Sequence, residues 1–344
     1  MDEYVGLDVS KEETSYCVMS GDGVVVARGK ALSDPDALVS ALGRHCACPA
    51  RVVLETGTLS AWLARELRSR GLPVSVVDAR QAHAVLRLQR NKTDAGDAEQ
   101  LAGLARSGFF HAVSVRSEAG QVDRLMLKAR SLLVRQRRDA ENAIRGLLGS
   151  LGIRFAKGKA LLTRRVSAAL EGRPDLREMI EPLLSVVAHL KREIARLDDT
   201  VSARAKADDA VRLLMSAPGI GPVTALAFAA TIDDAGRFRH SRAVGAYVGL
   251  TALRFQSGEM DWSGRISKRG DTMLRSLLYE AAGVFLTVVR KAHPLKDWAR
   301  RIARRSGQRK ARVALARKMA VILHRMLVTG EAFRWPEPRK PATA

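Results

Sequence analysis

Eight apolar residues between positions 176 and 201 recur at alternating spacings of four and three without a break. This heptad spacing puts one apolar side chain on the same side of every helical turn, so the helix needs a second helix to cover that seam. Pro182 predicts a kink or a separate first turn. The seam consists of Leu176, Ile180, Leu183, Val187, Leu190, Ile194, Leu197 and Val201.

Two kinds of partner could cover this seam. A second amphipathic helix is predicted over residues 118–151, where Val122, Leu125 and Leu132 recur at helical spacing with arginines between later leucines. The seam could pack on that helix within one chain, or it could pair two copies of the chain. Residues 152–173 are rich in Lys and Arg and are predicted to be irregular.

The first eighty residues have the pattern of an α/β domain. Residues 5–10 alternate apolar and polar side chains, and the runs 14–20 and 24–28 flank a Gly-Asp-Gly turn, which predicts three antiparallel strands. A helix over 33–44, a strand over 51–55, a helix over 60–70 and a strand over 74–77 follow. This order is typical of a ribonuclease-H-like domain, in which Asp8 and Glu55 would face each other at the ends of the first and fourth strands.

Two further acids stand at the start of the next predicted helix. Residues 91–97 read Asn-Lys-Thr-Asp-Ala-Gly-Asp, which places Asp94 and Asp97 three residues apart. Carboxylates this close on one helix repel each other unless a proton or a cation neutralises them, and a divalent metal is the obvious cation. The alternative is that the two acids only cap the helix.

The charge of the chain points to a polyanionic partner. Lys and Arg total 58 against 36 Asp and Glu, a formal charge of +22. Between Arg290 and Lys340 there are sixteen Lys and Arg residues and three acids. Such an excess is usual for proteins that bind nucleic acid. With no long apolar run and no secretion signal, a soluble cytoplasmic protein is expected.

The three cysteines do not form a disulfide framework, which suits a reducing compartment. His45, Cys46 and Cys48 could offer three soft metal ligands, but no second ligand pair accompanies them. We interpret this segment as loop packing.

The C-terminal third carries two notable blocks. Residues 217–225 contain a Pro-Gly-Ile-Gly-Pro turn that predicts a helix-hairpin-helix element, with backbone N–H groups suited to a phosphate. Residues 249–271 hold three serines, and Ser257, Ser263 and Ser267 are equal candidates for a nucleophile on residue type alone. Aromatic residues are sparse, so a base-stacking platform is not expected.

Three segments together resemble a known family. Residues 6–11 (Gly-Leu-Asp-Val-Ser-Lys), 54–58 (Leu-Glu-Thr-Gly-Thr) and 91–98 are similar to the Asp-Glu-Asp-Asp signature of insertion-sequence transposases of family one-ten, relatives of the Piv and MooV invertases. The resemblance implies a RuvC-like N-terminal domain that binds Mg²⁺, expected as two ions, with Mn²⁺ as the other candidate. Its ligands would be Asp8, Glu55, Asp94 and Asp97, with Lys92 on the nucleic acid and Thr93 nearby.

The same resemblance extends to residues 249–271. It implies that Ser257 is the nucleophile, which would form a covalent serine-DNA intermediate when the RuvC-like domain of one subunit meets the transposase domain of another. Arg265, Lys268 and Arg269 would hold backbone phosphates. The later helices add Arg304 and Arg305 to the predicted nucleic-acid contacts.

The expected organisation has four parts. Residues 1–115 form the RuvC-like catalytic domain, 116–208 a helical coiled-coil connector, 209–335 a mainly α transposase domain, and 336–344 a tail. The predicted partners are donor and target double-stranded DNA, a bridge RNA such as some family members use, and further copies of the chain, as a dimer or as a tetramer in the synapse. Pairing of two copies through the heptad seam is favoured because recombination holds two DNA partners together.

Three other functions remain open. The first strand with Lys11 also resembles the first phosphate loop of actin-like sugar kinases, although no further glycine-rich loop accompanies it. A RuvC-type junction endonuclease would use metal-activated water and leave Ser257 structural. A non-catalytic nucleic-acid-binding scaffold would use the acids only as helix caps.

Overall fold

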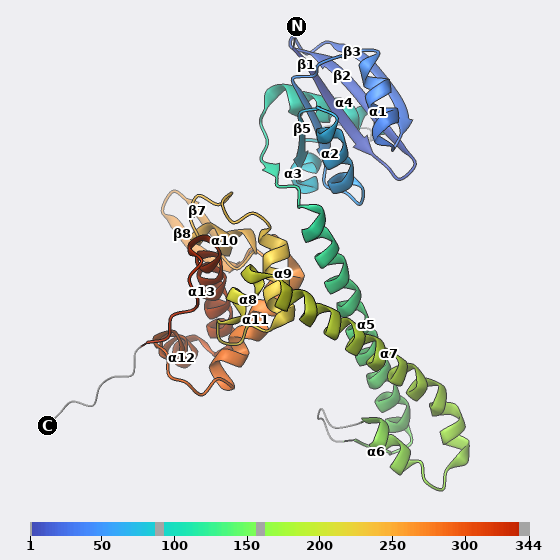
Figure 1. Ribbon diagram of the computed structural model, residues 1–344, viewed down its shortest axis with the longest axis vertical. Helices are drawn as coiled ribbons and strands as arrows, with labels where there is room; N and C mark the ends of the chain where they lie inside the picture. The colour runs from blue at the N-terminus through green and yellow to red at the C-terminus, as the bar shows by residue number, and fades with distance from the viewer. Residues whose placement is uncertain (1, 87–92, 156–161, 337–344) are drawn as a thin grey trace, which may run out of the picture. The chain divides into compact units, whose positions relative to one another are not determined.

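The computed structural model describes residues 2–86, 93–155 and 162–336. It divides into two compact units, Met1–Arg116 and Ser117–Ala344 (Figure 1). The first unit is a sheet covered by helices, and the second is mainly helical. None of the described helices combines the length and the apolar character needed to cross a bilayer.

The described part of the first unit contains a mixed sheet in the order β3-β2-β1-β4-β5-β6. Strand β1 pairs antiparallel with β2 and parallel with β4, which confirms the predicted order of an antiparallel hairpin followed by alternating helices and strands. The elements are β1 (Glu3–Val9), β2 (Glu13–Ser20), β3 (Val25–Leu32), α1 (Pro35–Gly43), β4 (Arg51–Glu55), α2 (Ser60–Ser69), β5 (Val74–Val77), α3 (Ala79–Leu86), α4 (Asp94–Ser107) and β6 (Ala112–Val113).

Helices cover both faces of this sheet, because alternate residues of each strand point to opposite sides. Val5 and Leu7 of β1 pack on the face that α1 and α2 cover. Val53 of β4 and Cys17 of β2 lie on the other face, where α4 packs. Helix α4 therefore lies directly over the strands that carry the predicted acids.

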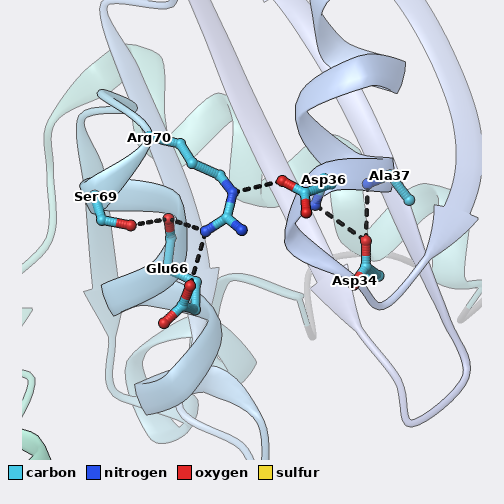
Figure 2. Close-up of polar contacts among 6 residues, drawn as sticks. All are labelled: Asp34, Asp36, Ala37, Glu66, Ser69 and Arg70. Carbon is cyan, nitrogen blue, oxygen red and sulfur yellow. Dashed lines mark hydrogen bonds and ion pairs between the residues drawn. The ribbon is translucent and has the colours of Figure 1, made fainter.

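Polar contacts join the ends of α1 and α2 (Figure 2). The Asp34 carboxylate caps α1 by accepting hydrogen bonds from the backbone N–H of Asp36 and Ala37. Arg70, just after α2, donates to Asp36 at 2.7 Å and to Glu66 at 2.8 Å. The hydrogen bond and charge of Arg70 hold the pKa of Asp36 below its usual range.

The second unit packs its C-terminal helices around a core that contains Phe228 and Phe285. A two-stranded hairpin, which the sequence pattern did not predict, stands among them. The elements are α5 (Glu118–Ser150), α6 (Leu162–Ala169), α7 (Pro174–Ala207), α8 (Asp209–Met215), α9 (Pro222–Ile232), α10 (Arg242–Tyr247), β7 (Ala252–Ser257), β8 (Met260–Ile266), α11 (Thr272–Thr287), α12 (Pro294–Ser306) and α13 (Gln308–Thr329).

Helix α7 packs along α5 of the same chain (Figure 1). Ile144 and Leu148, late in α5, share an apolar cluster with Ile180 and Val187, early in α7, so the two helices run antiparallel. Ion pairs between Arg130 and Asp198 and between Arg204 and Asp123 join the same two helices. The preference for pairing two protomers through this seam is thus corrected, since α5 covers it within the chain.

Two local predictions in this region also need correction. Of the two outcomes predicted for Pro182, a separate first turn is wrong, since α7 runs from Pro174 to Ala207 with Pro182 inside the helix. The segment 152–173, predicted to be irregular, contains helix α6. Its buried Val166 and Leu170 complete the apolar cluster at this end of the helical pair.

The predicted turn between two helices joins α8 to α9. Gly219 in this turn has a positive φ of 79°, and a Cβ there would lie 2.6 Å from the backbone oxygen of Ala281 in α11. The glycine is therefore required by close packing on α11. Ala217 and Ile220 are buried beside it.

Asp271 links α11 to α5. Its carboxylate caps α11 by accepting a hydrogen bond of 2.8 Å from the backbone N–H of Leu274, and it forms an ion pair with Arg124 of α5. The Asp271 side chain is 2% exposed and that of Arg124 is 17% exposed. Removing one partner would leave the other charge largely buried, which is costly.

Candidate active site

Asp8 and Glu55 stand at the same end of two neighbouring strands. Strands β1 and β4 are parallel, and Leu7 pairs with Leu54, so the residues that follow them lie at one level. Ser15 of β2 pairs with Asp8, and Lys30 of β3 pairs with Ser15. A polar row therefore crosses four strands at this end of the sheet.

Helix α4 lies against these strands because β1 has no side chain at position 6. A Cβ on Gly6 would lie 2.1 Å from the carbonyl oxygen of Ala98 and 2.3 Å from the backbone nitrogen of Ala102. Only glycine permits so close an approach of helix to strand. Gly6 therefore sets the position of α4 on the sheet.

The direction of α4 brings its first turn to the acidic end of the sheet. At the far end of the helix, Arg51 of β4 donates a 2.7 Å hydrogen bond to the carbonyl oxygen of Ala105. Ala98, nearer the start, lies over Gly6. Asp8 lies two residues beyond Gly6 along β1, and Asp94 lies four residues before Ala98 along α4. Both steps cover about 6 Å and run toward the same end of the sheet, so the first turn of α4 lies near the level of Asp8.

The two helical acids have different surroundings. Asp97 is 5% exposed, while Asp94 is exposed and lies 3.8 Å from the ammonium group of Lys30. Thr93 caps the helix by accepting a hydrogen bond from the backbone N–H of Gly96. The side-chain cap is thus a threonine, so Asp94 and Asp97 do not serve as the cap residue, although both still favour the helix dipole.

These four acids share one end of the first unit but do not form a ready ligand set. Within residues 2–86, 93–155 and 162–336, no three His, Cys, Asp or Glu side chains lie close enough together to hold a metal ion. The donors suit Mg²⁺, which prefers carboxylate oxygens. A bound ion would have to draw the carboxylates closer, and Lys30 would have to release Asp94. Lys92 lies outside the described residues.

Ser257 is the last residue of β7, at the tip of the β7–β8 hairpin. It pairs with Met260 across a turn in which Gly258 has a positive φ of 54°, and its side chain is exposed. Arg254 donates two hydrogen bonds, of 2.8 and 2.6 Å, to Asp261 on the opposite strand. These bonds hold the pKa of Asp261 below its ordinary value and fix the two strands to each other.

The rival serines lie elsewhere on the hairpin and its exit loop. Ser263 pairs with Arg254 in the middle of the hairpin. The backbone N–H of Ser267 donates to the carbonyl oxygen of Thr251. Of the three, Ser257 alone lies at the tip of the hairpin.

Five of the predicted nucleic-acid contacts are exposed, namely Arg265, Lys268, Arg269, Arg304 and Arg305. Arg265 is the next-to-last residue of β8, and Lys268 and Arg269 follow in a loop that passes close to the backbone of Gly249. Arg304 and Arg305 belong to the last turn of α12. Arg265 and Lys268 line a cleft that Arg269, Arg304 and Arg305 do not line.

The cysteine segment agrees with loop packing. Cys46 is buried in the core beneath α1 and α2, and burial together with Glu3 raises its pKa to about 12. Cys48 is exposed. Among the described residues, these side chains do not form part of any group of three that could hold a metal ion.

Family models match two ranges of this chain. Residues 5–153 match the DEDD transposase family model of the IS110 type, and residues 211–300 match the family described as "Transposase IS116/IS110/IS902 family". The protein named "Probable family 20 transposase" of Pseudomonas aeruginosa is 32% identical over 83% of this chain and 86% of its own length. The chain belongs to the IS110 family of transposases.

Other IS110-type relatives cover nearly the whole chain. The transposase for insertion sequence element IS1111A of Coxiella burnetii is 29% identical over 96% of this chain and 91% of its own length. The transposase for element IS1328 of Yersinia enterocolitica is 27% identical over 83% of this chain and 86% of its own length. An IS110-family member is a DNA transposase, so this chain is an enzyme that binds DNA.

The family assignment also bears on the fold and the cofactor. A DEDD transposase domain suggests a ribonuclease-H-like fold for the first unit and is typically dependent on a divalent metal. The first matched range contains Asp8, Glu55, Asp94 and Asp97, and the second contains Ser257. The hairpin that presents Ser257 was missed from the sequence; its signal was the Ser-Gly-Glu turn between two runs of alternating side chains.

Proposed function

We propose that this transposase cuts and rejoins DNA through a covalent bond to Ser257, with the acids of the first unit holding divalent metal. The observation that carries the proposal is the packing of α4 on Gly6, since it puts the acidic first turn of α4 at the end of the sheet where Asp8 and Glu55 lie. Four carboxylates at one end suit one or two Mg²⁺ ions, with Mn²⁺ as the substitute.

The chemistry divides between the two units. The Ser257 hydroxyl oxygen attacks the phosphorus, a serine-phosphate ester forms, and the bond from phosphorus to the sugar oxygen of the leaving strand breaks. The serine gives up its proton, and the leaving oxygen takes one. A bound divalent ion would supply positive charge to the phosphate oxygens. Rejoining reverses these bonds with a different strand as the acceptor.

Partners follow from the same proposal. The acids would come from one subunit and Ser257 from another, in a dimer or a tetramer that holds donor and target DNA. A bridge RNA would select the sites, and the excess of 22 positive charges suits such a load of nucleic acid. We retain residues 116–208 as the connector and 209–335 as the serine-bearing part.

The test is the formation of a protein-DNA adduct that survives denaturation. Full-length chain is incubated with labelled element-end DNA, a candidate bridge RNA and Mg²⁺, and adducts are resolved on a denaturing gel. Wild type is expected to give an adduct that Ser257→Ala abolishes and the matched Ser263→Ala keeps. Asp97→Asn is expected to abolish the adduct while DNA binding persists, because it removes a carboxylate and leaves the basic surfaces intact.

Two results would replace the proposal. If Ser257→Ala still cleaves DNA and no variant forms an adduct, the chain is a RuvC-type endonuclease that uses water. If no condition yields cleavage and DNA binding is the same with and without Mg²⁺, the acids serve structure and the chain acts as a scaffold.

A further inference from the structure

A cleft of about 1450 Å³ lies between the β7–β8 hairpin and the helices α12 and α13. All of these elements belong to the second unit (Figure 1). Three aromatic residues line it, namely Phe255 of β7, Trp262 of β8 and Trp298 of α12. The fold thus brings together three aromatic residues that come from three different elements.

Phe255 and Trp262 form a stacked pair that is open to solvent. They are cross-strand partners, their ring centroids are 4.3 Å apart, and the ring planes differ by 20°. Phe255 is 46% exposed and Trp262 is 54% exposed. Gly264 lies beneath both rings, where a Cβ would be 3.2 Å from the Phe255 ring. The hairpin therefore presents a flat aromatic surface that no other described part of the chain covers fully.

Charge identifies the kind of occupant. Seven Lys and Arg residues and no Asp or Glu are found among the described residues that line the cleft: Arg242, Arg265, Lys268, Arg309, Lys310, Arg317 and Lys318. So many cations without a carboxylate among the described lining residues suit a polyanion. The occupant is therefore a polyanion that also has flat apolar faces.

Unpaired nucleotides have both properties. Every base has a π-face that can stack on an aromatic side chain, and every nucleotide carries a phosphate for Lys or Arg. In a duplex the base faces are covered by their neighbours, so a duplex would leave the aromatic pair without a partner. We propose that this cleft binds unpaired nucleotides of a DNA or RNA strand, with a base on the Phe255–Trp262 pair.

This inference rests on the proposed function and adds to it a site for the strand near the nucleophile. Along β7, Phe255 and Ser257 are two residues apart and so lie on the same side of the strand, at a spacing of about 7 Å. A base stacked on Phe255 and Trp262 would hold the neighbouring phosphates close to the hairpin tip. Phe255 and Trp262 are thus positioning residues for the strand.

The test measures binding by the full-length chain, without requiring catalysis. Fluorescence anisotropy compares labelled single-stranded DNA, single-stranded RNA and the matching duplexes, each about 12 nucleotides long. The variants are Trp262→Ala, Phe255→Ala and the conservative Trp262→Phe. Phe109→Ala, which removes an 87% exposed aromatic ring of the first unit, is the matched control.

Loss of a stacking ring is expected to weaken single-strand binding by about 5- to 150-fold, while Trp262→Phe and Phe109→Ala stay close to wild type. Duplex binding and the salt dependence of affinity should not change, because the rings carry no charge. The DNA and RNA arms show which strand the cleft prefers.

The inference is overturned if Trp262→Ala and Phe255→Ala bind single strands within about twofold of wild type, or if they weaken single-strand and duplex binding equally. If those variants bind single strands normally while wild type forms the Ser257 adduct, the cleft assignment fails and the proposed function stands. If ring-dependent binding is found and no adduct ever forms, the proposed function fails and the cleft assignment stands.

Discussion

Replacing Gly6 with alanine should separate α4 from the sheet. The new Cβ would lie 2.1 Å from the Ala98 carbonyl oxygen, whereas ordinary contact begins at 3.4 Å, so the helix must move by about 1.3 Å. The atoms in the way belong to the backbone and cannot rotate aside. Overpacking costs about 1–3 kcal/mol, and we expect the upper end of that range here.

Calorimetry of the full-length chain measures this cost as a shift of the transition of the first unit, expected to be about 10–20 °C downward. Gly103→Ala on the same helix is the control. Its Cβ would meet no neighbour within 4 Å, so it should stabilise the helix by about 0.5–1 kcal/mol. A Gly6→Ala protein that melts within a degree or so of wild type would refute the close packing. Adduct formation should also fall in this variant, because Asp94 and Asp97 move with α4.

Three further outcomes are expected. Asp271→Ala should destabilise the second unit by about 3–5 kcal/mol, as measured by denaturant titration, because it removes the cap of α11 and leaves the mostly buried Arg124 without its ion-pair partner. A loss of stability below about 1 kcal/mol would contradict this. Asp36→Asn should lower the melting temperature at pH 7, and this difference from wild type should disappear as the pH falls well below 3.8. Arg70 depresses the pKa of Asp36 in the folded state, and its contact with Asp36 is lost when the carboxylate is protonated. A difference in melting temperature that persists at about pH 2 would show that the ion pair is not its cause. A maleimide should label only Cys48 in the folded chain and all three thiols after denaturation, and rapid labelling of a second thiol would argue against the burial described.

Much of the first unit could be predicted from local pattern. Strict alternation over residues 5–10 and the turn at 21–23 specify neighbouring strands, and β1, β2 and β4 are found where predicted. The pattern also placed Asp8 and Glu55 at one end, because parallel neighbours end together. The sequence pattern could not decide whether Asp94 and Asp97 bind a metal or cap the helix, since the capping role of Thr93 depends on its backbone conformation.

The fold of the second unit was harder to predict from the sequence, for a physical reason. A heptad seam shows that a helix needs a partner but does not say which helix, because any apolar stripe can fill it. The β7–β8 hairpin was missed although its side chains alternate, since β7 is exposed along its whole length and only Gly264 and Ile266 of β8 are half-buried, so no buried apolar face marks the strands. The aromatic cleft could not be predicted, because Phe255 and Trp298 are far apart in sequence and meet only through the packing of α12 and α13.

The central claim is that Asp8, Glu55, Asp94 and Asp97 hold the metal on which the reaction depends. Its most direct test is an anomalous difference map from crystals of the full-length chain soaked in Mn²⁺. We predict a peak about 2.0–2.3 Å from carboxylate oxygens of at least three of these four residues, with Lys30 withdrawn from Asp94. A well-ordered site with no peak, or a metal bound elsewhere in the chain, would contradict the account.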